Sequence, residues 1–221
     1  MTTPTLLLRP GGSRDRSGPM TPTEVGTVTT TAGQYGDAWD LSGDGYLTFP
    51  TANHVTPARG TILMRVQCPA LSDIAMLYDA HGTRHRVFLS SGRTITTRFG
   101  PTSRASGLTL TQNTPHVVGA RWGGGRHQAV LDTTFGPVFE DEHGSTVEAT
   151  ARLGRSLSGT FPFPGLIESV LLYDTKLSDG EITEIASMPE AWTWDNATFP
   201  ERTVFPVLTP GPRPITMLTP H

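Results

Sequence analysis

Cysteine and lysine are almost absent from this chain of 221 residues. One cysteine, Cys68, excludes an internal disulfide and a cysteine-based zinc site. Apolar residues precede Cys68 at every second position, which predicts a buried thiol rather than a nucleophile. Lys176 is the one lysine, and the formal net charge is -3. Because nucleic-acid binding normally needs clustered cations, no nucleic-acid partner is expected.

Long apolar runs are missing as well. No stretch approaches the roughly 18 consecutive apolar residues that a membrane helix requires, so no membrane insertion is expected. The first ten residues contain the short apolar run Leu6–Leu8, which is far shorter than the apolar region of a secretory signal. We therefore expect a protein that is made in the cytoplasm without a signal peptide.

The residue patterns of common active sites do not occur. The strand pattern E-x-D-x-x-E of retaining glycosidases is missing. The acidic group at residues 140–143, which ends in His143, is contiguous, so neighbouring carboxylates would alternate between two faces. We interpret this group as a solvated turn, with a divalent-cation site as the alternative. Residues 154–159 do not fit the G-x-S-x-G turn of hydrolases. His81 and His85 are predicted to lie in a hairpin with turn and surface roles. No enzyme activity and no cofactor are expected.

The middle of the chain is patterned as short strands. Runs of β-branched and aromatic residues are separated by glycine and proline turns between residues 23 and 188. Residues 61–68 alternate, with Met64 and Val66 on one side and Arg65 on the other. Further strands are predicted at residues 74–78, 84–89, 93–99, 108–110, 116–122, 127–131 and 166–173. The pattern predicts an all-β fold, an antiparallel two-sheet sandwich in one domain.

A single short helix is expected after the last strand. Ser178 and Glu181 form a capping box, in which a hydroxyl and a carboxylate satisfy otherwise unpaired backbone N–H groups. This places the helix start near Asp179. The helix should end by Met188, because Pro189 disfavours a helical residue before it.

Both ends of the chain differ from the middle in composition. Residues 1–22 are rich in proline and glycine, so we expect a flexible N-terminal arm. Residues 189–221 combine prolines with aromatic and aliphatic side chains, which are unfavourable in water. We expect this C-terminal arm to dock on a neighbouring subunit, with packing on its own sandwich as the alternative. The expected docking residues are Trp192, Trp194, Phe199, Phe205, Leu208, Ile215 and Leu218.

The segment from Gly165 to Ile182 resembles the closing segment of laminin-G-like and pentraxin-like domains, which are concanavalin A-like jelly rolls. The family pattern is G-x-I-D/E-x-V-x-I/L-Y, then L-S-x-x-E-I after a few residues. The matching residues are Gly165, Ile167, Glu168, Val170, Leu172, Tyr173, Leu177, Ser178, Glu181 and Ile182. Residues 39–47 are similar to the opening hairpin of the family, and residues 61–66 and 115–122 to two further strands. The resemblance covers roughly residues 24–187 and implies a jelly-roll sandwich with extended terminal arms.

The resemblance also implies candidate ligand sites. Many members bind calcium through loop carboxylates, and Asp44 and Asp132 stand at matching positions. Thr133 replaces the glycine of the family, and Asp44 is also explained as a turn former. Trp39 and Trp122 occupy strand positions that the resemblance makes core-facing, with sugar stacking as the alternative.

Laminin-G-like domains occur in tail and capsid-surface proteins of bacteriophages, so the resemblance and the arms together predict a non-enzymatic virion structural protein. We expect a minor tail protein or a capsid decoration on the virion surface, bound to other virion proteins and to further copies of itself. A host-surface glycan is the expected outward contact. The alternative is a stand-alone carbohydrate-binding module or lectin that depends on calcium.

Overall fold

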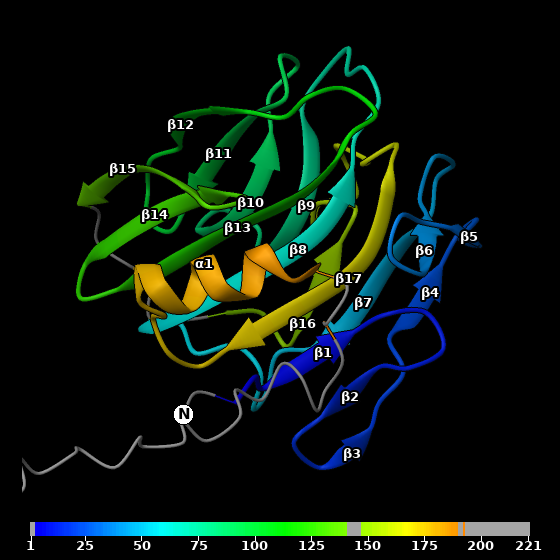
Figure 1. Cartoon of the computed structure of the whole chain (residues 1–221), viewed down its shortest axis with the longest axis horizontal. Coiled ribbons are helices and arrows are strands. Elements are labelled where there is room, and N and C mark those ends of the chain that lie inside the picture. The colour runs from blue at the N-terminus through cyan, green and yellow to red at the C-terminus, as the bar shows by residue number, and fades with distance from the viewer. Residues whose placement is uncertain (1–2, 141–146, 190–191, 193–221) are drawn as a thin grey trace, which may run out of the picture.

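The computed structural model describes residues 3–140, 147–189 and 192. Two antiparallel sheets form a sandwich, and one helix covers the outside of the larger sheet (Figure 1). The elements are β1 (Leu6–Leu8), β2 (Arg14–Asp15), β3 (Gly18–Pro19), β4 (Thr23–Val25), β5 (Thr29–Ala32), β6 (Asp37–Asp40), β7 (Tyr46–Pro50), β8 (Arg59–Gln67), β9 (Ala75–His81), β10 (His85–Leu89), β11 (Thr94–Arg98), β12 (Arg104–Thr109), β13 (Pro115–Gly123), β14 (Arg126–Leu131), β15 (Thr134–Glu140), β16 (Thr150–Leu153), β17 (Leu166–Tyr173) and α1 (Asp179–Ser187). The predicted all-β jelly-roll sandwich is confirmed.

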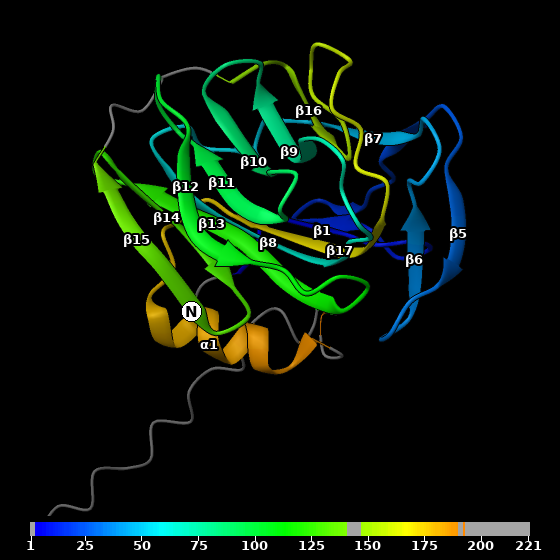
Figure 2. The ribbon, with the colours of Figure 1, turned by 90° about the horizontal axis from the view of Figure 1, so that it is seen from above.

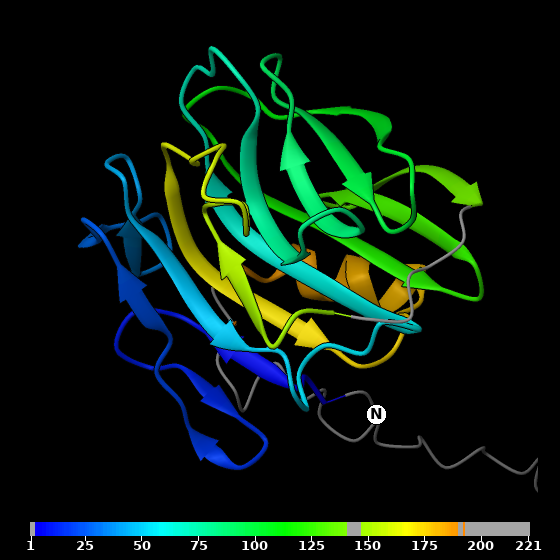
Figure 3. The same ribbon diagram turned by 180° about the vertical axis from the view of Figure 1, so that it is seen from behind.

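The larger sheet has the strand order β15-β14-β13-β8-β17-β1-β2-β3, with β6 pairing β17 and β5 pairing β6. The smaller sheet has the order β12-β11-β10-β9-β16-β7-β4 and faces the viewer in Figure 3. The main hydrophobic core lies between the two sheets. Each predicted strand is found, although the prediction at residues 108–110 covers only the end of β12.

The alternation predicted for β8 places apolar side chains in the core. Met64, Val66 and the following Cys68 belong to the core cluster between the sheets. Cys68 is buried as predicted, and this burial raises the pKa of its thiol to about 11. Trp39 and Trp122 also lie in this core, which confirms their predicted core-facing positions.

Helix α1 packs on the outer face of the larger sheet (Figure 2). The predicted capping box is present, with Ser178 as the N-cap and Glu181 at its third helical position. Ile182 and Ile185 face the sheet in a second apolar cluster, together with Tyr173 and Leu63. Among the residues that the structure describes, no helix is long and apolar enough to cross a membrane.

The N-terminal segment is not a flexible arm. Strand β1 lies between β17 and β2, with Leu6 opposite Leu172 and Leu8 opposite Val170. Its side chains are fully buried, Leu6 and Leu8 in the core and Leu7 beneath the helix. An apolar run can be a strand when both of its faces are covered, and β1 is covered by the core on one side and α1 on the other. The predicted boundary at residue 22 is therefore wrong.

Two further predictions need correction. Residues 39–47 do not form a hairpin, because β6 pairs within the larger sheet and β7 within the smaller one. The turn between these strands instead connects the two layers. His81 and His85 do pair across the β9–β10 hairpin, but His85 is a core residue rather than a surface one. Its ring packs edge-on against Trp122 at a centroid distance of 4.7 Å.

The C-terminal prediction is corrected at one residue. Trp192 is 3% exposed and packs on its own sandwich in the cluster beneath α1. Its Nε1 donates a hydrogen bond at 3.0 Å to the Ile185 carbonyl, which also accepts from the Met188 backbone N–H at the helix end. The other expected docking residues lie outside the described part of the chain, namely Trp194, Phe199, Phe205, Leu208, Ile215 and Leu218.

Candidate functional site

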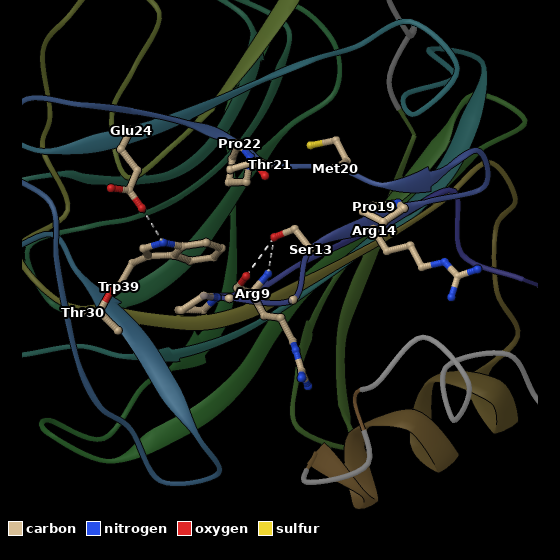
Figure 4. A pocket seen from close by; sticks show the side chains of 13 residues that line it. Arg9, Ser13, Arg14, Pro19, Met20, Thr21, Pro22, Glu24, Thr30 and Trp39 are labelled. Carbon is tan, nitrogen blue, oxygen red and sulfur yellow. Dashed lines mark hydrogen bonds between the residues drawn. The ribbon is translucent and has the colours of Figure 1, made fainter.

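A cavity of about 500 Å³ lies where the N-terminal segment meets β4, β5 and β6 (Figure 4). Its volume is within the range of known small-ligand sites. The lining residues are Arg9, Pro10, Gly11, Gly12, Ser13, Arg14, Pro19, Met20, Thr21, Pro22, Glu24, Thr30 and Trp39. Most of them come from the segment between β1 and β4, so the inserted strand β1 is a precondition for the cavity.

Trp39 joins the cavity to the core. Its side chain leaves β6 opposite Thr30 of β5, and it is 2% exposed. The indole Nε1 donates a hydrogen bond to Oε1 of Glu24 at 3.1 Å, from the neighbouring β4 (Figure 4). This bond fixes the Glu24 side chain and leaves its second oxygen available to a ligand.

A tight turn after β1 forms another wall. The Ser13 hydroxyl donates to the Arg9 carbonyl at 2.8 Å and accepts from the Arg9 backbone N–H at 2.9 Å. Gly11 adopts a φ of 66°, a left-handed conformation that glycine accepts without strain. The Met20 backbone N–H donates to the Ser13 carbonyl at 3.0 Å, which ties the turn to the chain that returns toward β4. The wall is thus held by hydrogen bonds within the segment.

The side chains that line the cavity offer several polar groups. Glu24 is the one carboxylate among the lining residues, all of which are described. The lining also holds no histidine or cysteine. The Arg9 guanidinium has no acceptor among the described residues, and Thr21 and Thr30 add hydroxyl groups. These groups can form hydrogen bonds to a polar ligand of moderate size.

Asp44 and Asp132 lie in separate loops and have local partners. Asp44, between β6 and β7, accepts a hydrogen bond from the Thr27 backbone N–H at 3.0 Å, and this bond lowers the pKa of its carboxyl. Asp132, between β14 and β15, accepts from the Val117 backbone N–H at 2.8 Å and contacts His116 at 2.8 Å. No group of three or more metal-ligating side chains is present in the described ranges. Calcium binding at these residues stays a prediction.

Glu168, the acidic residue of the closing pattern, has a structural role. Its carboxylate lies 3.2 Å from Arg65 and accepts hydrogen bonds from the backbone N–H groups of Gln34 and Tyr35. The Arg65 guanidinium lies over the rings of Tyr35 and Trp192, at 5.0 and 5.4 Å from their centroids. This buried ion pair therefore ties the β5–β6 loop and the start of the C-terminal segment to the sheet.

Sequence reasoning missed the cavity residues because it assigned Arg9 and Ser13 to an arm. One signal for them was present. The run Leu6–Leu8 stands between Pro4 and Pro10, and a short apolar run bounded by turn residues is consistent with a fully buried strand. Glu24 and Thr30 carry no motif, and only the pairing of β4 with β7 and of β5 with β6 brings them to one cavity.

No family model matches the sequence, and no curated protein matches it. Solved structures with similar folds are found at low sequence identity. Domain 4 of AbnA, a GH43 extracellular arabinanase from Geobacillus stearothermophilus in complex with arabinotriose, has a TM-score of 0.69 and 15% identity, covering 84% of this chain and 98% of that domain. A mutant Trypanosoma rangeli sialidase displaying trans-sialidase activity has a TM-score of 0.65 and 14% identity, covering 87% of this chain and 33% of the sialidase.

A third structure is that of botulinum neurotoxin type C, whose uptake into cells is dependent upon interaction with two ganglioside molecules. It has a TM-score of 0.64 and 12% identity, covering 84% of this chain and 51% of the toxin chain. The chain thus spans about a third of the sialidase and half of the toxin chain, but nearly all of the arabinanase domain. At these identities the likeness concerns the fold, and it places the chain among jelly-roll-like β-sandwich domains.

Proposed function

We propose that the chain is a non-enzymatic structural component of a bacteriophage virion, a minor tail protein or a capsid decoration, whose sandwich binds a glycan of the host surface. The observation that carries the binding role is the cavity bounded by Trp39 and Glu24. Saccharides present many hydroxyl groups together with apolar ring faces, and they need a site that offers both kinds of contact. The free oxygen of Glu24 and the Arg9 guanidinium provide the polar contacts, and Pro10, Pro19 and Met20 of the cavity wall provide the apolar ones.

The similar arabinanase domain suggests a first ligand to test. That domain is in complex with arabinotriose, and this chain covers almost its whole length. Arabinotriose is neutral and rich in hydroxyl groups, and the hydrogen-bonding groups of the cavity suit such a ligand. We therefore choose it as the probe for the cavity.

Titration calorimetry with arabinotriose tests the binding role. We expect a dissociation constant in the millimolar range or tighter, weakened at least about tenfold in Glu24→Ala, because a hydrogen bond to a charged group contributes about 1.5–3 kcal/mol. Glu184→Ala, which removes an exposed carboxylate from α1, is the matched control and should bind as the native chain does. Glu24→Gln keeps an acceptor for the Trp39 indole and separates lost binding from lost folding. Equal affinity of Glu24→Ala and the native chain for arabinotriose would exclude this cavity as the binding site.

The virion role is supported by the C-terminal composition. Residues 193–221 hold six prolines together with aromatic and aliphatic residues such as Phe199 and Leu208, and they follow directly on the anchored Trp192. Because Trp192 is held by its own domain, a truncation after it leaves the described sandwich intact. The residues beyond it are then available to a neighbouring subunit, including a further copy of this chain.

A truncated chain that ends at Trp192 tests this part of the proposal. In an infection complemented with either form, we expect the full chain in purified particles and the truncated chain absent from them, although both remain folded by circular dichroism. Light scattering should likewise show a larger assembly for the full chain. Incorporation of both forms in equal amounts would refute the docking role, and genes for capsid or tail proteins beside this gene would support it.

The second candidate is a stand-alone carbohydrate-binding module or lectin. It is favoured by the coverage of the arabinanase domain, which leaves little of that domain unmatched. Under this alternative, calcium would be held through Asp44 or Asp132. Glycan binding that is abolished by a chelator, in a chain that stays monomeric and is missing from particles, would select the lectin over the virion protein.

A further inference from the structure

Four charged side chains form a row across the smaller sheet. Arg98 of β11 stands directly opposite Arg86 of β10, Arg86 opposite Asp79 of β9, and Asp79 opposite Arg152 of β16. Residues directly opposite each other in antiparallel strands point to the same face of the sheet. We call Arg98, Arg86, Asp79 and Arg152 the arginine row.

The arginine row lies on the outer face of the sandwich. One residue further along each strand, Val87 stands opposite Tyr78, and Tyr78 opposite Leu153. These three residues belong to the core between the sheets. Successive side chains of a strand point to opposite faces, so the row points away from the core. This sheet faces the viewer in Figure 3.

Positive charge exceeds negative charge in the row, because three arginines share one aspartate. Asp79 is fully buried, and its Oδ2 lies 3.1 Å from Nε of Arg86 and accepts a hydrogen bond from the Leu157 backbone N–H at 2.8 Å. Its charge is therefore already paired. Arg152 donates to the Ser156 carbonyl at 2.9 Å and lies over the Tyr46 ring at 4.7 Å from its centroid, and it has no acidic partner among the described residues.

Arg98 likewise has no acidic partner in the part of the chain that the structure describes. Its Nη2 donates to the Pro101 carbonyl at 2.8 Å, while its Nε is buried and has no partner among the described residues. Like charges directly opposite each other, here Arg98 and Arg86, destabilise a sheet. A guanidinium presents its donors in a planar fork that matches a carboxylate or sulfate, and such an anion would relieve the repulsion.

We infer that the arginine row binds the anionic groups of an acidic polysaccharide, with uronate carboxylates held between Arg98 and Arg86. Neighbouring strands are about 4.8 Å apart, so the three strand steps from Arg98 to Arg152 span about 14 Å, which suits an extended polymer better than one small anion. Phe88, on the same face and half-buried, offers a ring for stacking. The inference shares the proposed glycan role but uses a surface separate from the Trp39 cavity.

Calorimetry with trigalacturonate, inorganic sulfate and arabinotriose tests the inference on the full chain. Arg98→Gln should weaken trigalacturonate binding at least tenfold, and Arg98→Lys should do so less, because lysine keeps the charge without the fork. Arg126→Gln removes an exposed arginine from β14 in the other sheet and should change little. Arg86 is left intact because its loss would leave the buried Asp79 without its ion pair. Thermal melting of each variant checks that it is folded.

Equal effects of Arg98→Gln and Arg126→Gln, or no binding of trigalacturonate, would overturn the inference. The inference would also be overturned if sulfate bound through Arg98 while trigalacturonate did not bind at all. The row would then be a simple anion site. Arabinotriose separates the two proposals. Its binding should respond to Glu24→Ala and not to Arg98→Gln, so loss of one activity leaves the other measurable.

Discussion

Replacement of Leu6 by alanine tests whether the N-terminal segment is part of the folded sandwich. Leu6 is completely buried in the core and stands opposite Leu172. The preceding Thr5 hydroxyl lies 2.9 Å from the His54 carbonyl and 3.1 Å from the Leu172 carbonyl, so the backbone there is held on both sides. Such a held site has little freedom to collapse around the missing side-chain atoms.

The expected cost follows from comparable substitutions. Buried leucine-to-alanine changes destabilise by about 2–5 kcal/mol, and we expect about 3 kcal/mol for Leu6→Ala. At about 2–4 °C for each kcal/mol in a chain of this size, the melting temperature should fall by about 6–12 °C. Differential scanning calorimetry measures this change.

The matched control is Ser17→Ala, an exposed position in the same N-terminal segment. A surface substitution of this kind usually changes stability by less than about 0.5 kcal/mol, so its melting temperature should stay within about 2 °C of the native value. If Leu6→Ala melts as close to the native chain as Ser17→Ala does, then β1 contributes nothing to the core and the segment is an arm.

Two further predictions concern titratable groups. Burial raises the pKa of Cys68 from the ordinary value of 9.0 to about 11, so at pH 8 about one thiol in a thousand is ionised in the folded chain. In the urea-unfolded chain about one in ten is ionised, so a disulfide reagent should react about 100-fold more slowly with the native chain, and equal rates would contradict the burial. Burial lowers the pKa of His54 below 6.5, only partly offset by Asp15 at 3.6 Å. As the pH falls, His54 is protonated in the unfolded chain before it is protonated in the folded one. The contribution of neutral His54 to folding stability is therefore present above pH 6.5 and is lost as the pH falls through the folded-state pKa. Melting temperatures between pH 8 and 5 should fall less steeply in His54→Gln, and an identical slope would refute this.

Local sequence signals predicted the parts of the fold that depend on neighbouring residues. The capping box of Ser178 and Glu181 is closed within a few residues, so the helix start was predictable. The core face of β8 was also predictable, because the apolar residues Ile62, Met64 and Val66 stand at every second position. In both cases the partner groups or the pattern lie within one element, and no knowledge of the rest of the chain is needed.

Long-range pairing was beyond these signals. Thr5 and Leu172 are separated by 167 positions, and a strand of three residues is too short to show a period. The turn at residues 41–45 has the composition of a hairpin, but Trp39 pairs with Ile167 while Tyr46 pairs with Val25. Turn chemistry alone does not distinguish a hairpin from a crossing between sheets. The Trp39 cavity was missed for this reason, since it depends on both pairings.

The arginine row follows from the same register that builds the core. Between β10 and β11, Leu89 stands opposite Ile95, and both side chains are buried in the core. A slip of one residue would turn the apolar set of β11 toward solvent and Arg98 toward the core, which is strongly unfavourable. The register that buries Ile95 therefore forces Arg98 to face Arg86. An individual arginine at an outward position is ordinary, and only the pairing of four strands reveals the excess of charge. The packing of the core thus fixes the geometry of the row. The fold itself does not require arginine at positions 86 and 98, so the choice of arginine at both needs a separate reason.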